Sequence, residues 1–425
     1  MSIEQIYAIF QQHPVVTTDS RNCRPGAVFF ALKGAQFDGN DYIEQVLDSG
    51  AAYAVGDRTG LPEDDRIIQV NNVLKTLQEL ANYHRKQMNA TVIAITGTNG
   101  KTTTKELMAA ALSSKYKTLY TPGNLNNHIG VPLTLLQLKP EHAFAVIEMG
   151  ANHPGEIHDL CLIAEPDYGL ITNVGKAHLE GFGSFEGVVR TKTELYAFLQ
   201  EKGGTAFCNL DNLILKDLYI SLSRIYYGST PEAFIHGKIT SSAPALALKW
   251  GGGAITTHLV GSYNFENVLA AICVASYFGV ENDKINRAIQ EYIPTNNRSQ
   301  NQKTETNDLI VDAYNANPSS MQAALENFNT LDISPKMVIL GEMKELGDYS
   351  REEHQKLTDN LSPQIDKVFL VGESFKECTS LHPQWKIFPT TGDLVEYLQT
   401  TPVAGYHILI KGSRGNQLEK VIPYL

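Results

Sequence analysis

Short apolar runs alternate with helical patterns along the whole chain. In the first part of the chain, three such runs and one helical pattern lie at 27–32, 52–55, 66–70 and 74–83. Turn residues such as Pro25-Gly26 separate them, because proline fixes its own backbone angle and glycine tolerates conformations closed to other residues. This pattern predicts a small α/β domain over residues 1–88.

From Thr91 onwards, the apolar runs are rich in β-branched residues, and polar or glycine-rich sequence follows them. They lie at 91–95, 144–147, 169–172, 309–311, 337–340, 368–371 and 407–410. Short buried strands that alternate with helices predict mostly parallel sheets. We therefore predict an α/β protein of three domains: the N-terminal one, a central domain over 89–295 and a Rossmann-like domain over 296–425.

The segment 91–112, TVIAITGTNGKTTTKELMAAAL, combines an apolar strand, a glycine-rich loop and a helix. Glycines let backbone N–H groups turn towards phosphate oxygens, the lysine reaches the outer phosphates, and the next hydroxyl ligates magnesium. Ile95 stands where the longer common form of this motif has its first glycine. A glycine-rich turn that only caps a helix is the alternative. The strand and helix on either side favour a nucleoside triphosphate site made by Gly97, Thr98, Asn99, Gly100, Lys101, Thr102 and Thr103.

Two polar residues follow neighbouring apolar runs and are candidates for a metal site. Glu148 comes directly after the run 144–147, and a carboxylate there is costly unless it is paired, for example with magnesium. His178 lies in the glycine-flanked segment ITNVGKAHLEGFGS. Taken singly, Glu148 could cap a helix and His178 could be an ordinary loop histidine. Because both follow strands that should end at one sheet edge, we predict that they lie near the phosphate loop.

The composition is that of an ordinary globular chain of 425 residues with a formal net charge of -11. That charge disfavours a broad nucleic-acid or membrane surface but allows a local basic pocket for phosphate. The scattered cysteines predict free thiols in a reducing cytoplasm, and the N-terminus does not resemble an export signal. The apolar run 268–280 is too short to cross a membrane. We expect a cytoplasmic monomer without a nucleic-acid partner or membrane insertion.

Several longer motifs make the chain similar to the Mur ligases, the ATP-dependent amide-forming enzymes of peptidoglycan synthesis. The first is the phosphate loop followed in order by Glu148, His178 and Lys192. The others are TDSRNCRPGAVFFALKGAQFDGNDYI, which is similar to a uridine-binding domain, and DAYNANPSSM, GEMKELGDYSREEH and LIKGSRGNQLEKVI near the C-terminus. Without the resemblance, Lys192 would be interpreted as a solvated helix lysine.

The resemblance implies roles for individual residues. Lys101, Lys192, His178 and Arg298 would be catalytic, Thr102, Glu148, His178 and Lys192 would hold metal, and Lys192 would be carbamylated. Asn264 and Asn267 would contact adenine, Asp312 the ribose and Arg298 the γ-phosphate. The family usually has a glycine where this chain has Asn297, which bears on hinge flexibility before Arg298.

Substrate residues also follow from the resemblance. Asp19, Ser20 and Arg21 would bind the uridine nucleotide, and Asn126 and Asn127 would line the channel for its sugar and peptide. The residues expected to bind the incoming dipeptide are Tyr314, Asn315, Asn317, Lys411, Ser413 and Arg414. Without the resemblance, the first trio would be interpreted as a turn with local hydrogen bonds, and each dipeptide residue could be a strand-end polar residue that satisfies the backbone.

The activity that the resemblance implies is the ATP-dependent joining of D-alanyl-D-alanine to UDP-N-acetylmuramoyl-tripeptide through an acyl phosphate, with two Mg²⁺ ions as cofactors. Closure of the third domain over the central one would exclude water, with 294–298 as the hinge. Two alternatives stay open: the preceding ligase, which adds the third amino acid, and a regulatory module that binds nucleotide without catalysis. The chain could also be the ligase portion of a longer fusion.

Overall fold

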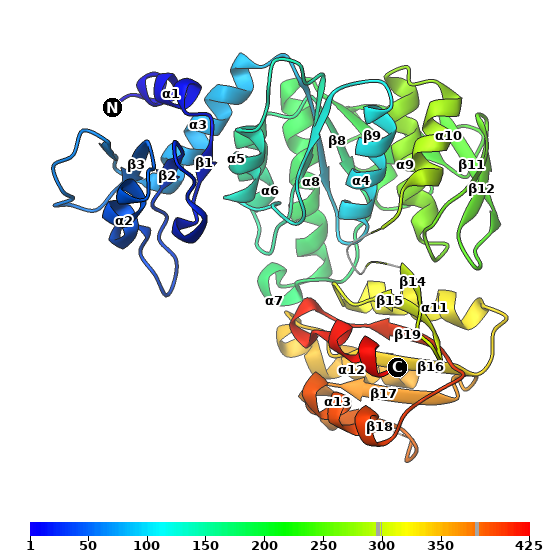
Figure 1. Cartoon of the computed structure of the whole chain (residues 1–425). Helices are drawn as coiled ribbons and strands as arrows, with labels where there is room; N and C mark the ends of the chain where they lie inside the picture. The colour runs from blue at the N-terminus through cyan, green and yellow to red at the C-terminus, as the bar shows by residue number, and fades with distance from the viewer. Residues whose placement is uncertain (295–297, 299, 379–381) are drawn as a thin grey trace.

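Three sheets follow one another along the chain and form three α/β units (Figure 1). The computed structural model describes residues 1–294, 298, 300–378 and 382–425. Within these residues the sheets are mostly parallel, which confirms the predicted fold class. The predicted boundary at 88/89 falls between the first two sheets, whereas the one at 295/296 lies outside the described residues.

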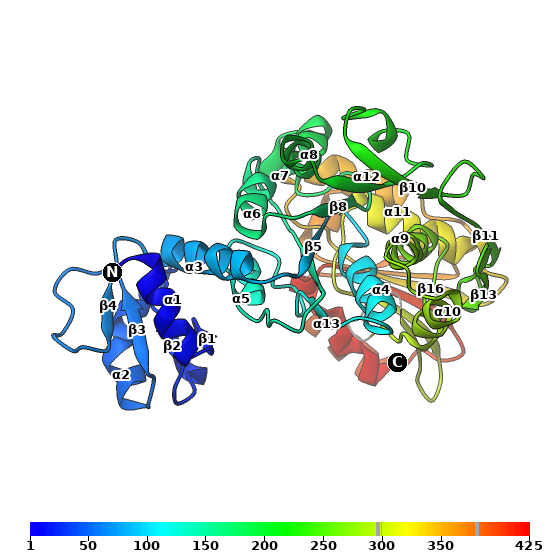
Figure 2. The ribbon, with the colours of Figure 1, turned by 90° about the horizontal axis from the view of Figure 1, so that it is seen from above.

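The N-terminal unit is a small sheet, wholly within the described residues, with four parallel strands in the order β1-β2-β3-β4. Its elements are α1 (Ile3–Gln12), β1 (Val16–Thr17), η1 (Ser20–Asn22), β2 (Val28–Phe30), η2 (Gly39–Tyr42), α2 (Ile43–Asp48), β3 (Tyr53–Gly56), β4 (Ile67–Gln69) and α3 (Val73–Gln87). The helix α3 packs against α1 and against the next unit, and Figure 2 shows it as the bridge between the two. The predicted runs correspond to β2, β3, β4 and α3.

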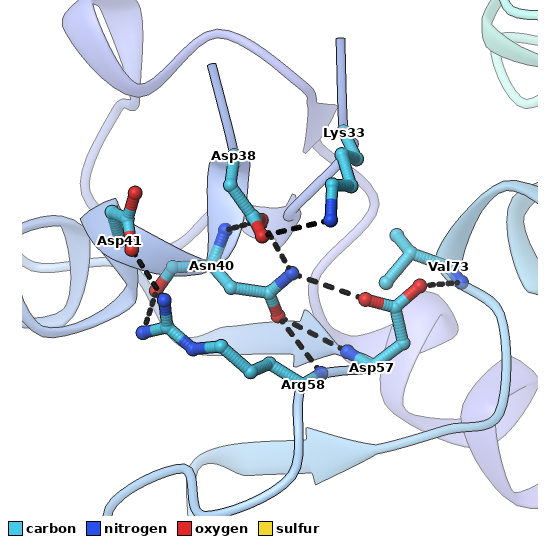
Figure 3. Close-up of polar contacts among 7 residues, drawn as sticks. All are labelled: Lys33, Asp38, Asn40, Asp41, Asp57, Arg58 and Val73. Atoms are coloured by element: carbon cyan, nitrogen blue, oxygen red, sulfur yellow. Dashed lines mark hydrogen bonds and ion pairs between the residues drawn. The ribbon is translucent and has the colours of Figure 1, made fainter. Parts of the chain in front are cut away.

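A buried asparagine ties the N-terminal unit to the start of this bridge (Figure 3). The amide of Asn40 donates to Asp38 Oδ1 at 2.7 Å and to Asp57 Oδ1 at 3.0 Å, and its oxygen accepts from the Asp57 backbone N–H. The other carboxylate oxygen of Asp57 accepts from the Val73 N–H, the first residue of α3, at 3.1 Å. The loop after β2 and the base of α3 therefore share one satisfied polar network.

The central unit carries the phosphate loop on a larger sheet, in which the described residues form nine strands. Its elements are β5 (Thr91–Thr96), α4 (Lys101–Ser113), β6 (Thr118–Tyr120), α5 (Gly130–Leu135), β7 (Phe144–Glu148), α6 (Glu156–Ala164), β8 (Tyr168–Ile171), α7 (Leu179–Phe182), α8 (Phe185–Lys202), β9 (Thr205–Asn209), η3 (Leu215–Asp217), β10 (Ser223–Gly228), β11 (Ile235–Ser241), β12 (Ala247–Trp250), β13 (Gly253–Thr256), α9 (Asn264–Tyr277) and α10 (Asn282–Glu291).

The order of the strands explains where the central site forms. It is β13-β12-β11-β10-β9-β8-β5-β7-β6, so the chain moves to one side of β5 and later to the other. Along β5, Val92 and Ala94 belong to one apolar cluster, and Ile93 and Ile95 belong to another. Both faces of the sheet are thus covered. In such sheets, ligands bind beyond the carboxyl ends of the strands at the point where the order reverses, which here is the end of β5.

The third unit lies beside the carboxyl edge of the central sheet (Figure 1). Its described elements are β14 (Gln300–Lys303), β15 (Asp308–Asp312), α11 (Pro318–Thr330), β16 (Lys336–Gly341), η4 (Gly347–Tyr349), α12 (Ser350–Asp359), β17 (Lys367–Val371), η5 (Glu373–Glu377), β18 (Lys386–Phe388), α13 (Thr391–Thr400), β19 (His407–Lys411), η6 (Arg414–Asn416) and η7 (Leu418–Tyr424). The sheet has the order β14-β15-β19-β16-β17-β18, with β14 as an antiparallel edge strand. All four predicted strands are present.

The apolar run 268–280 falls mostly within α9, which is buried on almost all sides in the central unit. A core helix needs such a continuous apolar surface. In the part of the chain that the structure describes, no helix has both the length and the apolar character that a membrane span requires.

Candidate active site

A cavity of about 1160 Å³ lies between the central and third units at the carboxyl edge of the central sheet. Leu74 and Gln78 of α3 also reach its wall. The predicted residues that line it are Thr98, Asn99, Gly100, Lys101, Thr102, Thr103, Asn126, Asn127, Glu148, His178, Asn264, Asn267, Arg298, Asp312, Tyr314, Asn315, Asn317, Lys411, Ser413 and Arg414. Segments hundreds of residues apart therefore share one space.

The phosphate loop needs its two glycines for different reasons. Gly100 has φ +79°, and a Cβ there would lie 2.4 Å from Asn267 Oδ1 on α9. Gly97 has φ +139°, and a Cβ there would lie 2.0 Å from the hydroxyl of Thr172. Both positions combine a left-handed backbone with close packing, so a side chain would strain the loop or displace its supports.

Lys101 begins α4 and folds back on the loop that precedes it. Its ammonium donates hydrogen bonds to the carbonyl oxygens of Gly97 at 2.8 Å and Thr98 at 3.0 Å. Burial lowers the pKa of Lys101 to about 8; repulsion from Arg298 adds to this effect, and attraction to Glu148 opposes it. The lysine thus lies within the loop, close to a second cation and to a carboxylate.

Glu148, at the end of β7, is a buried carboxylate beside the loop. Its Oε1 accepts hydrogen bonds from the Thr102 hydroxyl at 3.2 Å and from Asn126 Nδ2 at 2.8 Å. Its Oε2 has no hydrogen bond in the structure, although Lys105 Nζ forms an ion pair with it at 3.4 Å. An ionised oxygen with spare acceptor capacity, next to a threonine hydroxyl, is the oxygen-rich environment that suits Mg²⁺.

Lys192 lies on α8 and is buried, unlike an ordinary helix lysine. Its Nζ donates to the Ala151 carbonyl at 3.4 Å and lies 5.2 Å from the centre of the Phe182 ring. Burial lowers the pKa of Lys192 from 10.5 to about 7, and repulsion from Lys101 adds to this effect. Ala151 lines the cavity, and Lys192 therefore lies directly behind the cavity wall. This amine loses its proton more readily than that of an exposed lysine, and the neutral form of an amine is the nucleophilic one.

Three of the four predicted metal ligands, Thr102, Glu148 and His178, line the cavity, and Thr102 contacts Glu148. Within the described ranges, no three His, Cys, Asp or Glu residues are arranged to hold a metal ion. His178, which lines the cavity, forms an ion pair through Nδ1 with Glu345 of the third unit, and this contact lowers the pKa of Glu345. The histidine thus joins two units across the cavity.

The residues predicted to bind adenine and ribose lie in the cavity wall, each with a protein partner. Asn267 Nδ2 donates to Asn264 Oδ1 at 2.9 Å, and Asn264 Nδ2 donates to the Val260 carbonyl at 2.8 Å. In the third unit, Lys411 Nζ donates to Asp312 Oδ2 at 2.7 Å. These contacts hold the side chains in position, since buried polar groups need partners.

Two arginines lie beside the ring of Tyr314, one of the residues predicted to bind the dipeptide. The guanidinium of Arg298 lies 4.0 Å from the centre of the Tyr314 ring, and that of Arg414 lies 5.8 Å from it. Asn317 Nδ2 donates to Asn99 Oδ1 of the phosphate loop at 2.8 Å, and the Asn317 oxygen caps α11. Two arginines beside one ring make this wall of the cavity cationic, which suits anionic ligands.

Comparison with known proteins agrees with this arrangement. The chain matches the Mur ligase middle domain at residues 95–275, the glutamate ligase domain of Mur ligases at 297–414 and the Mur ligase family catalytic domain at 14–85. The chain is 36% identical to the UDP-N-acetylmuramoyl-tripeptide--D-alanyl-D-alanine ligase of Escherichia coli, over 96% of this chain and 92% of that protein. The chain belongs to the Mur ligase family.

Solved structures of Mur ligases share the whole architecture. A crystal structure of MurF from Acinetobacter baumannii is 31% identical, covers 99% of this chain and 98% of its own, and superimposes with a TM-score of 0.86. A MurF ligase from Thermotoga maritima, solved in complex with ADP, is 28% identical over 97% of each chain, with a TM-score of 0.85. The family resemblance inferred from the motifs is therefore confirmed.

The uridine trio of this Mur ligase lies apart from the cavity. Asp19 caps the turn η1 through the Arg21 N–H, and its carboxylate forms an ion pair with the Arg21 guanidinium at 2.8 Å. Hydrogen bonds from Arg21 lower the pKa of Asp19 to about 2. Both features agree with the local-turn alternative, and the uridine role of Asp19, Ser20 and Arg21 stays a prediction. Of the predicted hinge, residues 295–297 lie outside the described residues.

Sequence reasoning missed several residues that hold the site together. Lys105 is fully buried, donates to the Gly123 carbonyl at 3.0 Å and contacts Glu148. The Asn173 side chain donates to the Asn99 carbonyl at 3.1 Å and accepts from the Asn99 N–H at 3.0 Å. Asn173 lies in the same segment as His178, directly after a predicted strand. The rule that placed His178 near the phosphate loop could therefore have placed Asn173 there too. For Lys105 the sequence holds no such signal, because most helix lysines are solvated.

The burial of Lys192 should cost folding stability in this Mur ligase. Between about pH 7 and 10.5 the unfolded chain binds a proton that the folded chain does not, so the free energy of unfolding rises with pH. We expect Lys192→Met to raise the free energy of unfolding by about 1 kcal/mol or more at pH 7, and by less at pH 9.5. Urea denaturation in buffer without CO₂ would measure this. Lys202→Met, at the exposed end of α8, is the control, and a gain independent of pH would contradict the explanation.

Proposed function

We propose that this Mur ligase joins D-alanyl-D-alanine to UDP-N-acetylmuramoyl-tripeptide with ATP. The observation that carries the proposal is the agreement, over 96% of the chain, with relatives that bear this activity in their names, together with a phosphate loop in the cavity. The ADP complex of the Thermotoga maritima MurF ligase supports ATP as the nucleotide. The wall that carries Arg298 and Arg414 supplies positive charge, and the position of the cavity between two units supplies the enclosure that such chemistry requires.

The reaction divides into two steps. The terminal carboxylate of the tripeptide attacks the γ-phosphorus of ATP, which forms an acyl phosphate and releases ADP. The amine of D-alanyl-D-alanine then attacks the acyl carbon, loses a proton, and expels inorganic phosphate to leave an amide. Lys101 and Arg298 neutralise charge on the transferring phosphoryl group, and the packed third unit keeps water from the acyl phosphate.

Magnesium fits beside Glu148. The Thr102 hydroxyl and the Glu148 carboxylate would hold it, as the Glu148 oxygen without a hydrogen bond suggests, and it would neutralise phosphate charge there. His178 is proposed to complete the metal ligands after release from Glu345.

Lys192 is proposed to be carbamylated. Its neutral amine would add to CO₂ and lose a proton, which gives an anionic oxygen in place of a cation. Such a group could hold a second Mg²⁺ ion, whereas an ammonium would repel it.

A substrate comparison tests the function and separates it from the alternatives. With ATP and UDP-N-acetylmuramoyl-tripeptide, we expect phosphate release and a pentapeptide product by mass spectrometry only when D-alanyl-D-alanine is added. Turnover of the corresponding dipeptide nucleotide with a free diamino acid would instead assign the preceding step. Nucleotide binding without phosphate release in either mixture would favour a regulatory module.

A further inference from the structure

The third unit meets the central unit through the first turn of α11. This turn rests on the loop that follows β8 and on the phosphate loop. The hydroxyl of Ser319 accepts a hydrogen bond from the Lys176 N–H at 2.9 Å, and Asn317 contacts Asn99 from the same turn. A second contact, an ion pair of 2.8 Å between Lys176 and Glu353 of α12, supports the same junction.

Gly175 leaves the space that Ser319 occupies. A Cβ at residue 175 would lie 2.6 Å from Ser319 Oγ and 3.1 Å from Ser319 Cβ, whereas its nearest neighbour within the central unit would be Thr98 Cγ2 at 3.6 Å. The backbone of Gly175 is not in the left-handed region, so an alanine there is free of backbone strain. The glycine is therefore required by the third unit and not by the fold of the central unit.

The position of this turn decides where the ligand residues of the third unit lie. Asn317 is the N-cap of α11, Ser319 lies in its first turn, and Tyr314 lies only three residues before the N-cap. Gly175 is in turn fixed to the phosphate loop through the hydroxyl of Thr98. This hydroxyl accepts a hydrogen bond from the Gly175 N–H at 3.0 Å and donates one to the Gly175 carbonyl at 3.3 Å. A shift at Ser319 would thus move the Tyr314 wall relative to Lys101.

We propose that Ser319 is a positioning residue for the ligase reaction, whose insertion against Gly175 seats the third unit on the phosphate loop. The inference rests on the proposed function for its kinetic test, but the docking itself can be measured without turnover. Rotation of the Ser319 hydroxyl would not relieve an alanine at 175, because it would break the hydrogen bond to Lys176 and leave the two Cβ atoms 3.1 Å apart.

Gly175→Ala tests the contact between Gly175 and Ser319 by a change in the central unit. We expect kcat/KM for D-alanyl-D-alanine to fall about tenfold, as overpacking and a lost hydrogen bond imply. Small-angle scattering should also show the change. With ATP analogue and UDP-N-acetylmuramoyl-tripeptide bound, the Gly175→Ala variant should have a larger radius of gyration than the wild-type protein. Adding Ser319→Gly removes both close contacts and should restore part of the lost activity, although the hydrogen bond to Lys176 stays broken. Adding Ser319→Ala should restore less, because its Cβ would still lie 3.1 Å from the new methyl group.

Controls keep the result specific to the junction. Gly251→Ala is the matched variant, because a Cβ there has no neighbour within 4 Å, and it should retain full activity. Ser319→Leu overfills the same contact with a side chain from the third unit. It should lower kcat/KM as Gly175→Ala does, and it provides the test if Gly175→Ala fails to fold. Unchanged kcat/KM in Gly175→Ala, or a loss that Ser319→Gly leaves in place, would overturn the proposal. If the unchanged protein lacks ligase activity, the proposed function fails, and the scattering comparison still tests the docking.

Discussion

Lys192→Ala is expected to lower kcat about a hundredfold or more and to leave the folded structure intact. The lysine lies behind the cavity wall at Ala151, where a carbamate would supply an anionic oxygen next to the phosphates. Alanine cannot form that group, and it leaves empty the volume that the lysine side chain fills. Short carboxylic acids should enter this space and restore part of kcat. Steady-state turnover with and without acetate would measure both effects.

Two comparisons make the Lys192 experiment decisive. Lys202→Ala removes a lysine from the exposed end of the same helix and should leave turnover unchanged. The unchanged enzyme should lose activity in buffer depleted of CO₂ and regain it with bicarbonate, and the alanine variant should show no response to bicarbonate. Full activity in Lys192→Ala would refute the carbamate.

Lys101→Ala is expected to lower kcat by about 10² to 10³ with a smaller change in KM for ATP. The ammonium lies in the phosphate loop, where burial strengthens its interaction with charge that develops on the transferring phosphoryl group. Charge that builds up in the transition state gains more from a fixed cation than ground-state ATP does. Initial rates over a range of ATP concentrations would separate the two parameters.

Lys115→Ala is the matched control for Lys101. It removes an exposed lysine just beyond the other end of α4, where the side chain pairs with Glu281 at the surface. We expect normal kinetics from this variant. A Lys101→Ala enzyme that keeps its kcat at saturating ATP would show that the lysine has no role in phosphoryl transfer.

Local sequence determined the elements and the phosphate loop. The strand β5, Gly97, Gly100 and the start of α4 are adjacent in the chain, so the apolar pattern and the glycines were enough to predict a strand, a loop and a helix in this order. The same holds for Glu148 at the end of β7, because a polar residue that ends a buried run marks a strand terminus. Parallel neighbours on either side of β5 then placed these ends at one edge.

Tertiary structure decided the burial and the partners of the site residues. Lys192 and Lys105 are helix lysines that a one-dimensional pattern assigns to solvent, and only the packing of other elements around α8 and α4 encloses them. His178 meets Glu345, and Gly175 admits Ser319, because a separate unit packs across the carboxyl edge. Such contacts depend on the relative placement of whole sheets, which short-range preferences do not encode.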